Sequence, residues 1–166
     1  MDVGLESRLI IHKIIKLSIN NSINIDNAFL KTTKEVNLTI ENKKFIYNTS
    51  FTSIRQFFLI KKIIKKLVKK IDYKNDTFIL LLSSLTQLLL MNIKEYAVVN
   101  SSVELCKQKK INSSAKLINA TLRNFLRKKN YFLKEKVSFE DYPNWFCKNI
   151  NNLNNREKKE FIKNIN

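Results

Sequence analysis

Residues 96–127 of this chain read YAVVNSSVELCKQKKINSSAKLINATLRNFLR. Apolar side chains recur at helical spacing in both halves of this stretch, and a polar turn around Asn112 and Ser114 separates the halves. The two apolar faces consist of Val99, Val103 and Cys106, and of Leu117, Ile118, Thr121, Leu122 and Phe125. Two consecutive amphipathic helices are therefore predicted, and they require a common core that the rest of the chain must supply.

The composition of the whole chain favours one all-α domain. The sequence has 166 residues, of which 44% are hydrophobic, and this is enough for a domain with its own core. It contains one Gly and one Pro, whereas sandwiches, barrels and doubly wound sheets need many such residues in their turns and loops. We expect a single compact helical bundle of about seven or eight helices.

Helical periodicity and its interruptions place the remaining elements. Helices are expected over residues 5–19, 26–36, 41–71 and 77–91, and from about 155 onward, with a kink near 55–58. Residues 131–137 look irregular, and Ser138 with Asp141 resembles a helix start. The segment 77–91 reads as a central helix that is buried on most sides.

The segment 60–71 has the clearest amphipathic pattern in the chain. One half of its helical wheel is apolar, and the other half carries Lys61, Lys62, Lys65, Lys66, Lys69 and Lys70. A basic amphipathic helix can lie on an anionic membrane or bind a partner groove. Packing of the apolar half into its own bundle accounts for the same pattern without any function.

The chain is strongly basic, with 31 Lys and Arg against 14 Asp and Glu and a formal net charge of +17. A polyanion is the natural partner of such a surface. Abundant Lys, Asn and Ile together are also typical of a genome rich in A and T, and Lys is common on solvated helix faces. Because Arg binds phosphate with a planar fork, a polyanion-binding site is expected where Arg and Lys gather on one side.

Other classes of site and location find little support. The longest apolar segment, 78–91, is too short and too polar to span a bilayer, and the first residues do not resemble a secretory signal. Cys106 and Cys147 lack metal-ligand spacing, and His12 is the one histidine, so neither a zinc site nor a disulfide scaffold is expected. We expect a reduced, cytoplasmic protein with no membrane partner.

Two segments resemble the family of NusB-like RNA-binding domains. LLSSLTQLLLMNIKEYAVVNSSVELCK at 81–107 and SAKLINATLRNFLR at 114–127 are similar to its Gln-Leu-Leu, Ala-Val-Asn-x-x-Val-Glu-Leu-Ala and Val-Asn-Ala-Val-Leu-Arg elements. The matching positions are Gln87, Leu88, Leu89, Ala97, Val98, Asn100, Val103, Glu104, Leu105, Ile118, Asn119, Ala120, Leu122 and Arg123. The likeness covers about residues 5–130 and implies a bundle of the NusB type. Ser84 and Thr52 stand where that family has Gly, and Leu82 replaces a frequent Arg.

The C-terminal part distinguishes two branches of this family. YPNWFCKNI at 142–150 is similar to the His-Pro-x-Trp-Leu segment that joins a NusB-like domain to the rest of RsmB-type rRNA 5-methylcytosine methyltransferases, with Tyr142 in place of His. The resemblance implies a NusB-like domain over 1–135 and a helical extension over 136–166 that leads to a methyltransferase region in cis. A stand-alone antitermination factor that binds RNA with a ribosomal protein, and a basic bundle that mediates protein contacts alone, are the alternatives.

No catalytic residue, metal ligand or cofactor site is expected in this chain. A cytosine-C5 methyltransferase needs a nucleophilic Cys and a Gly-bearing loop for S-adenosylmethionine, but Cys106 and Cys147 fall outside such positions and Gly4 is the one glycine. The resemblance implies RNA, and rRNA in particular, as the partner. It selects as RNA-binding residues Arg8, Lys13, Arg55, Arg123, Arg127 and Lys128. Asn100, Glu104 and Asn119 are expected to link the two helices of 96–127 by hydrogen bonds. The sequence leaves the oligomeric state open.

Overall fold

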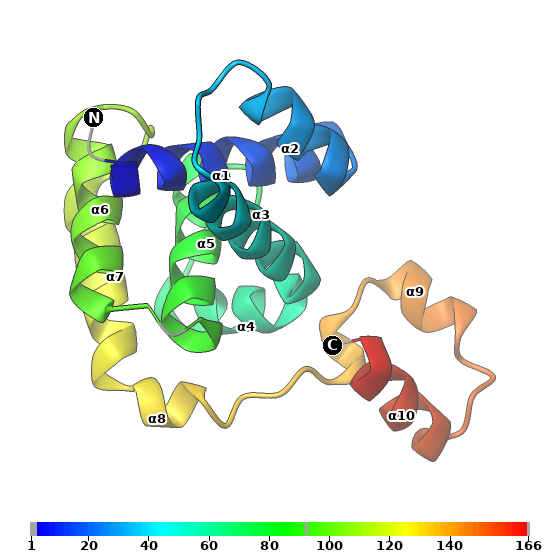
Figure 1. Ribbon diagram of the computed structural model, residues 1–166. Helices are drawn as coiled ribbons and strands as arrows, with labels where there is room; N and C mark the ends of the chain where they lie inside the picture. The colour runs from blue at the N-terminus through cyan, green and yellow to red at the C-terminus, as the bar shows by residue number, and fades with distance from the viewer. Residues whose placement is uncertain (1–2, 92, 166) are drawn as a thin grey trace.

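The computed structural model describes residues 3–91 and 93–165, and this part of the chain contains ten α-helices, one 3-10 helix and no strand (Figure 1). The elements are α1 (Val3–Asn21), α2 (Ile25–Thr33), α3 (Ile40–Arg55), α4 (Phe57–Leu67), α5 (Asp76–Leu90), α6 (Glu95–Lys107), α7 (Ala115–Arg127), α8 (Lys129–Phe132), η1 (Phe139–Asp141), α9 (Asn144–Asn149) and α10 (Asn155–Ile165). Eight of the α-helices have nine residues or more. The predicted all-α bundle is confirmed.

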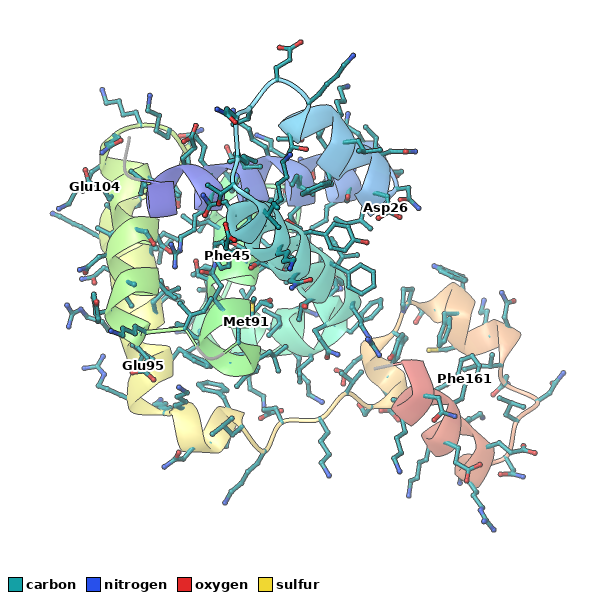
Figure 2. The ribbon with its side chains drawn as sticks, in the orientation of Figure 1. Asp26, Phe45, Met91, Glu95, Glu104 and Phe161 are labelled. Atoms are coloured by element: carbon teal, nitrogen blue, oxygen red, sulfur yellow. The ribbon has the colours of Figure 1, made fainter. Side chains whose placement is uncertain are left out.

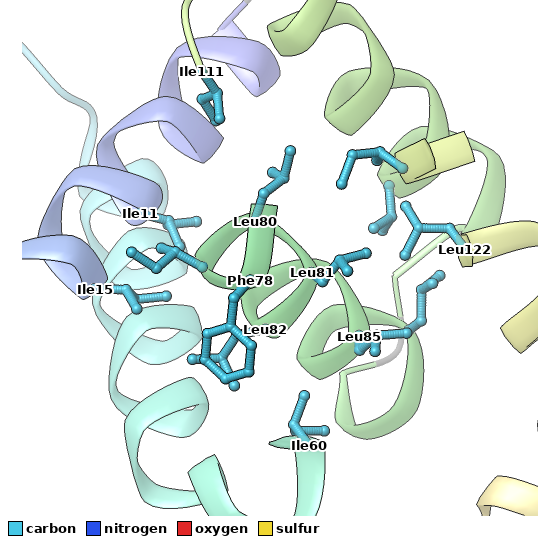
Figure 3. Packing of buried hydrophobic residues seen from close by; sticks show 14 of the residues in the cluster. Ile11, Ile15, Ile60, Phe78, Leu80, Leu81, Leu82, Leu85, Ile111 and Leu122 are labelled. Carbon is cyan, nitrogen blue, oxygen red and sulfur yellow. The ribbon is translucent and has the colours of Figure 1, made fainter. Parts of the chain in front are cut away.

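Helix α5 forms the centre of the bundle, as predicted for the segment 77–91. Its residues from Phe78 to Leu88 are all buried, and helices α1, α3, α4, α6 and α7 pack around it. Figure 3 shows Leu80 on one side of α5, Leu81 and Leu85 on another, and Phe78 and Leu82 on a third. Because each fully buried side chain of this kind contributes about 1.5–3 kcal/mol, this helix supplies a large share of the hydrophobic stabilisation.

Small side chains allow α5 and α6 to approach closely. The hydroxyl oxygens of Ser84 and Ser102 lie 2.8 Å apart, and both residues are buried. Each hydroxyl also lies 2.7 Å from a carbonyl oxygen one turn earlier in its own helix, that of Leu80 or Val98. A buried hydroxyl needs such a partner. Ser84 therefore maintains the close helix contact at a position where the resembled family has Gly.

The predicted kink near 55–58 is a complete break at Gln56. This residue leaves the helical conformation (φ −95°, ψ 20°) between the end of α3 and the start of α4, and its N–H donates to the carbonyl oxygen of Thr52 at 2.9 Å. The apolar half of α4 is buried as expected, with Ile60, Ile63 and Ile64 in the core. The break sets α4 at an angle to α3, so that both helices reach α5.

Helix α4 is shorter than its periodicity predicted. It ends at Leu67 because Val68 is extended (φ −129°, ψ 118°), so the prediction of a helix through residue 71 is wrong. The cause lies in tertiary packing, since Ile71 and Tyr73 pack against the core, and the Tyr73 ring contacts the Phe78 ring at 5.3 Å. Three other boundaries also differ from prediction: α1 extends to residue 21, α2 ends at residue 33, and α8 occupies the start of the segment that looked irregular.

The C-terminal segment folds back onto α4. Figure 1 shows α9 and α10 beside the bundle, after the extended connection that follows α8. The Tyr142 ring packs on the Phe58 ring of α4 at 4.6 Å, and Lys62 Nζ of α4 lies 2.8 Å from Asp141 Oδ2. Ser138 and Asp141 form the capping contact that the sequence indicated. The element is a single 3-10 turn, because Tyr142 and Pro143 are extended.

Candidate nucleic-acid interface

A groove of about 1170 Å³ lies where the start of α1 meets the antiparallel pair α6 and α7. Its basic lining residues are Arg8, Lys107, Lys110 and Lys116. Its other polar and aromatic lining residues include Tyr96, Asn100, Glu104, Gln108 and Asn119. Figure 2 shows Glu104 and Glu95 at opposite ends of α6, and the groove runs along α6 between these ends, since its lining on this helix extends from Tyr96 to Lys107.

The connection between α6 and α7 brings the groove lysines together. Lys109 adopts a left-handed conformation (φ 53°), in which the chain reverses, and the N–H of Lys110 donates to the carbonyl oxygen of Leu105 at 3.0 Å. Ser114 then caps α7, since its hydroxyl accepts from the N–H of Leu117 at 3.3 Å. A helix usually ends with Gly at the left-handed position, but Lys fills it here. Lysines on both sides of the turn consequently line one groove.

Arg8 is held against the central helix. Its Nε donates to Gln87 Oε1 at 3.0 Å, and its Nη1 donates to the carbonyl oxygen of Gly4 at 3.0 Å. The guanidinium carbon lies 5.5 Å from the centre of the Phe45 ring, within the range of a cation–π interaction. The Gln87 amide is itself buried and donates to the carbonyl oxygen of Ser83 at 3.1 Å. Arg8 therefore presents a fixed positive charge to the groove.

The other predicted RNA-binding residues are all exposed but lie in different places. Arg123 Nε donates to Asn119 Oδ1 at 3.0 Å, which brings its guanidinium to the edge of the groove. Lys13 lies on α1 beyond Arg8, and Arg127 and Lys128 lie at the C-terminal end of α7. Arg55 ends α3, far from the α6–α7 pair (Figure 1). The groove thus includes Arg8 and adjoins Arg123, and the remaining four residues flank it or lie elsewhere.

Sequence reasoning did not assign Lys107, Lys110, Lys116 or Tyr96 to the site. The run KQKK at 107–110 was the available signal, but the linear order does not show that Lys116 of the next helix faces it. Tyr96 is 65% exposed and supplies an aromatic ring to the groove. Exposed aromatic rings stack on the unpaired bases of single-stranded RNA.

The polar residues of α6 and α7 have a different role from the one expected. Glu104 Oε1 accepts from Gln108 Nε2 at 2.9 Å, and Asn119 accepts from Arg123. The first bond belongs to α6 and its C-cap and the second to α7, so neither links α6 to α7 as predicted. Together with Asn100, these side chains line the groove instead. Amides at such a surface can donate to phosphate, sugar and base edges.

The charge balance of the groove is positive. Four cations and one carboxylate, Glu104, are among its lining residues. Within residues 3–91 and 93–165, Lys107, Lys110 and Lys116 have no acidic group within 4.0 Å. Cations that have no internal partner are available to neutralise phosphates, and the accompanying release of counterions favours binding of a polyanion.

The described part of the chain lacks a cluster of metal-ligating side chains. No group of three His, Cys, Asp or Glu side chains in that part of the molecule could share a metal ion. Cys106 is buried, and burial raises the pKa of its thiol, which suits a core residue better than a nucleophile. Among the helices that the structure describes, none is both long enough and apolar enough to cross a membrane.

Most of the chain resembles known proteins. The chain is similar to the protein named "Probable ribosomal RNA small subunit methyltransferase B" of Coxiella burnetii (strain RSA 493 / Nine Mile phase I), with 31% identity over 116 residues. That similarity covers 66% of this chain and 27% of the relative, so the chain spans less than a third of the relative's length. A family model described as the NusB family matches residues 6–127, which include α2 to α7 and nearly all of α1. The chain therefore belongs to the NusB family.

Proposed function

We propose that this chain is the RNA-binding domain of an rRNA 5-methylcytosine methyltransferase, in which it positions rRNA for a methyltransferase region of the same polypeptide. The observation that carries this proposal is the basic groove between α1, α6 and α7. A cytoplasmic location follows from the same role. The chain's own residues bind and orient RNA, and the chemistry is assigned to another region.

The groove combines the three kinds of group that single-stranded RNA requires. Lys107, Lys110 and Lys116 supply charge for the phosphates, and Arg8 adds a guanidinium held in place by Gln87. Tyr96 supplies an exposed ring on which a base can stack. Lys13, Arg55, Arg127 and Lys128 are proposed as contacts to RNA that extends beyond the groove.

The C-terminal extension supports the methyltransferase assignment. We place the division between the RNA-binding domain and the connector at about residue 135, where the chain leaves α8 and packs on α4 through η1. The segment that resembles the methyltransferase connector, 142–150, forms α9 and the two extended residues before it. The similarity to a protein named as an rRNA methyltransferase points the same way. A coding sequence that ended directly after residue 166 would instead favour the antitermination role.

Fluorescence anisotropy with a labelled single-stranded rRNA fragment tests RNA binding at the groove. The variant K107Q/K110Q removes two groove cations, and K31Q/K34Q is its control, since Lys31 of α2 and Lys34 directly after this helix are exposed and are not among the groove residues. The logarithm of the RNA-binding constant falls as the logarithm of the salt concentration rises, and each lost phosphate contact should make this slope less steep by about 0.7. K107Q/K110Q should therefore make it less steep by about 1.4.

The control should bind like the wild-type protein, because its charge change is the same but its position differs. Equal losses in K107Q/K110Q and K31Q/K34Q would show that net charge alone governs binding and would contradict a site in the groove. A wild-type slope near zero would contradict RNA binding itself.

A further inference from the structure

We propose that a second surface, which we call the α4 hollow, binds phosphate groups of the same RNA strand that occupies the groove. This inference rests on the proposed function and extends its RNA contact to a new site. The α4 hollow has a volume of about 660 Å³ and lies where the chain leaves α4 and turns toward α5. Lys65, Lys69, Lys70 and Tyr73 are among its lining residues.

The structure divides the six lysines of residues 61–70 into two sets. Lys62 is paired with Asp141 at 2.8 Å and Lys66 with Glu135, so these two lysines hold the C-terminal segment on α4. The other four are Lys61, Lys65, Lys69 and Lys70, and none has an acidic group within 4.0 Å in the described ranges. Two of the six lysines thus hold the protein's own C-terminal segment, and the other four are available to a ligand.

The Tyr73 ring positions two of the four available lysines. Lys61 Nζ lies 4.2 Å from the centre of the Tyr73 ring, and Lys65 Nζ lies 5.8 Å from it. The ring is fixed from behind by its contact with Phe78. Asp72, the one acid in the lining, accepts from the backbone N–H of Lys74 at 3.0 Å. The Tyr73 ring thus holds the two lysine ammonium groups close together, and gathered cations of this kind bind the phosphates of a nucleic acid.

Helix α1 connects the α4 hollow to the groove. Near its C-terminal end, Asn20 Nδ2 donates to the carbonyl oxygen of Lys74 at 3.0 Å, while Arg8 near its other end lines the groove. These two residues differ by twelve positions, which at 1.5 Å per residue is about 18 Å along the helix axis. The exposed Lys13 lies between them. Even at about 3.4 Å per phosphate, the spacing along one strand of a duplex, an RNA of about twelve nucleotides extends about 40 Å, which is enough to reach both surfaces.

The test compares K69Q/K70Q with the wild-type protein and with K31Q/K34Q, using a labelled single-stranded RNA of about twelve nucleotides and anisotropy over a salt series. Lys69 and Lys70 are exposed and lie outside the helices, so the neutral variant should fold, which circular dichroism checks. Loss of two phosphate contacts is expected to weaken binding about 25-fold near 0.1 M salt and to lower the salt slope by about 1.4. The control should bind like the wild-type protein.

The outcomes separate this inference from the proposed function. If K107Q/K110Q weakens RNA binding but K69Q/K70Q behaves like K31Q/K34Q, the α4 hollow is not an RNA contact and the groove assignment stands. If the wild-type protein shows no salt-dependent binding, the proposed function itself fails. If K69Q/K70Q loses binding to vesicles that contain phosphatidylglycerol but keeps its RNA affinity, the hollow belongs to a membrane surface and the inference is overturned.

Discussion

Replacement of His12 by Gln tests how the bundle accommodates an ionisable group in its core. His12 is 4% exposed, and its Nε2 lies 3.5 Å from Asp76 Oδ1, which also pairs with Lys16 at 2.8 Å. Burial lowers the pKa of His12 from 6.5 to about 4, because it disfavours the charged imidazolium more than the Asp76 carboxylate favours it. Lys16 and Lys13 lower the pKa further by charge repulsion. At neutral pH, His12 is therefore a neutral core residue.

The lowered pKa makes the stability of the fold depend on pH. The folded protein binds fewer protons at His12 than the unfolded chain does in this pH range. The stability that neutral His12 gives to the fold is therefore fully present above pH 6.5 and is lost as the pH falls toward 4. The 2.5-unit difference between 6.5 and about 4, at about 1.36 kcal/mol per unit, corresponds to about 3 kcal/mol. That is a large part of the stability of a typical domain.

Urea unfolding of the wild-type protein and His12→Gln, at about pH 7.5 and about pH 4, measures this contribution. Both proteins should lose stability in acid, since other groups titrate in each of them. The wild-type protein should lose about 3 kcal/mol more than the variant, which has no imidazole to protonate. An equal loss in the two proteins would refute the argument, because it would mean that protonation of His12 costs the folded state nothing.

Two further predictions concern the turn after α6 and the C-terminal segment. Lys109→Gly should raise the free energy of unfolding, measured by urea titration, by about 1 kcal/mol, because Gly adopts the left-handed conformation without a Cβ clash. Its RNA affinity should stay near that of the wild-type protein, since Lys109 is not among the groove residues. A loss of stability would contradict the turn geometry. Asp141→Asn should weaken the contact with Lys62 and the cap at Ser138, and so speed proteolysis in 133–138. Glu160→Gln, at an exposed residue of α10, is the control. Equal cleavage rates in the two variants would contradict a docking role for Asp141.

Periodicity predicted the central part of the fold well. The segment of α5 carries apolar side chains on most sides and has no charged residue after its first turn, and a helix of that kind is expected at the centre of a bundle. The pair α6 and α7 followed from two amphipathic stretches and the capping residue Ser114. These features are local, so the sequence alone specifies them.

Features that depend on tertiary contacts could not be predicted. No Gly or Pro marks the end of α4, and residues 68–75 leave the helix because Ile71 and Tyr73 pack into the core. The groove depends on Arg8 meeting Gln87, seventy-nine positions later in the chain. Likewise, the separation of Lys62 and Lys66 from the other lysines of α4 requires acids from the C-terminal segment. Composition indicated a polyanion as the partner, but only the folded arrangement shows which cations converge.

The central claim is that RNA binds in the groove between α1, α6 and α7. Its most direct test is an amide NMR titration of the protein with a single-stranded rRNA fragment. The account predicts that the largest shift changes occur in the first turns of α1, at residues 107–110 and at residues 115–119. Changes confined to α2 and α3, with the groove amides unaffected, would contradict it.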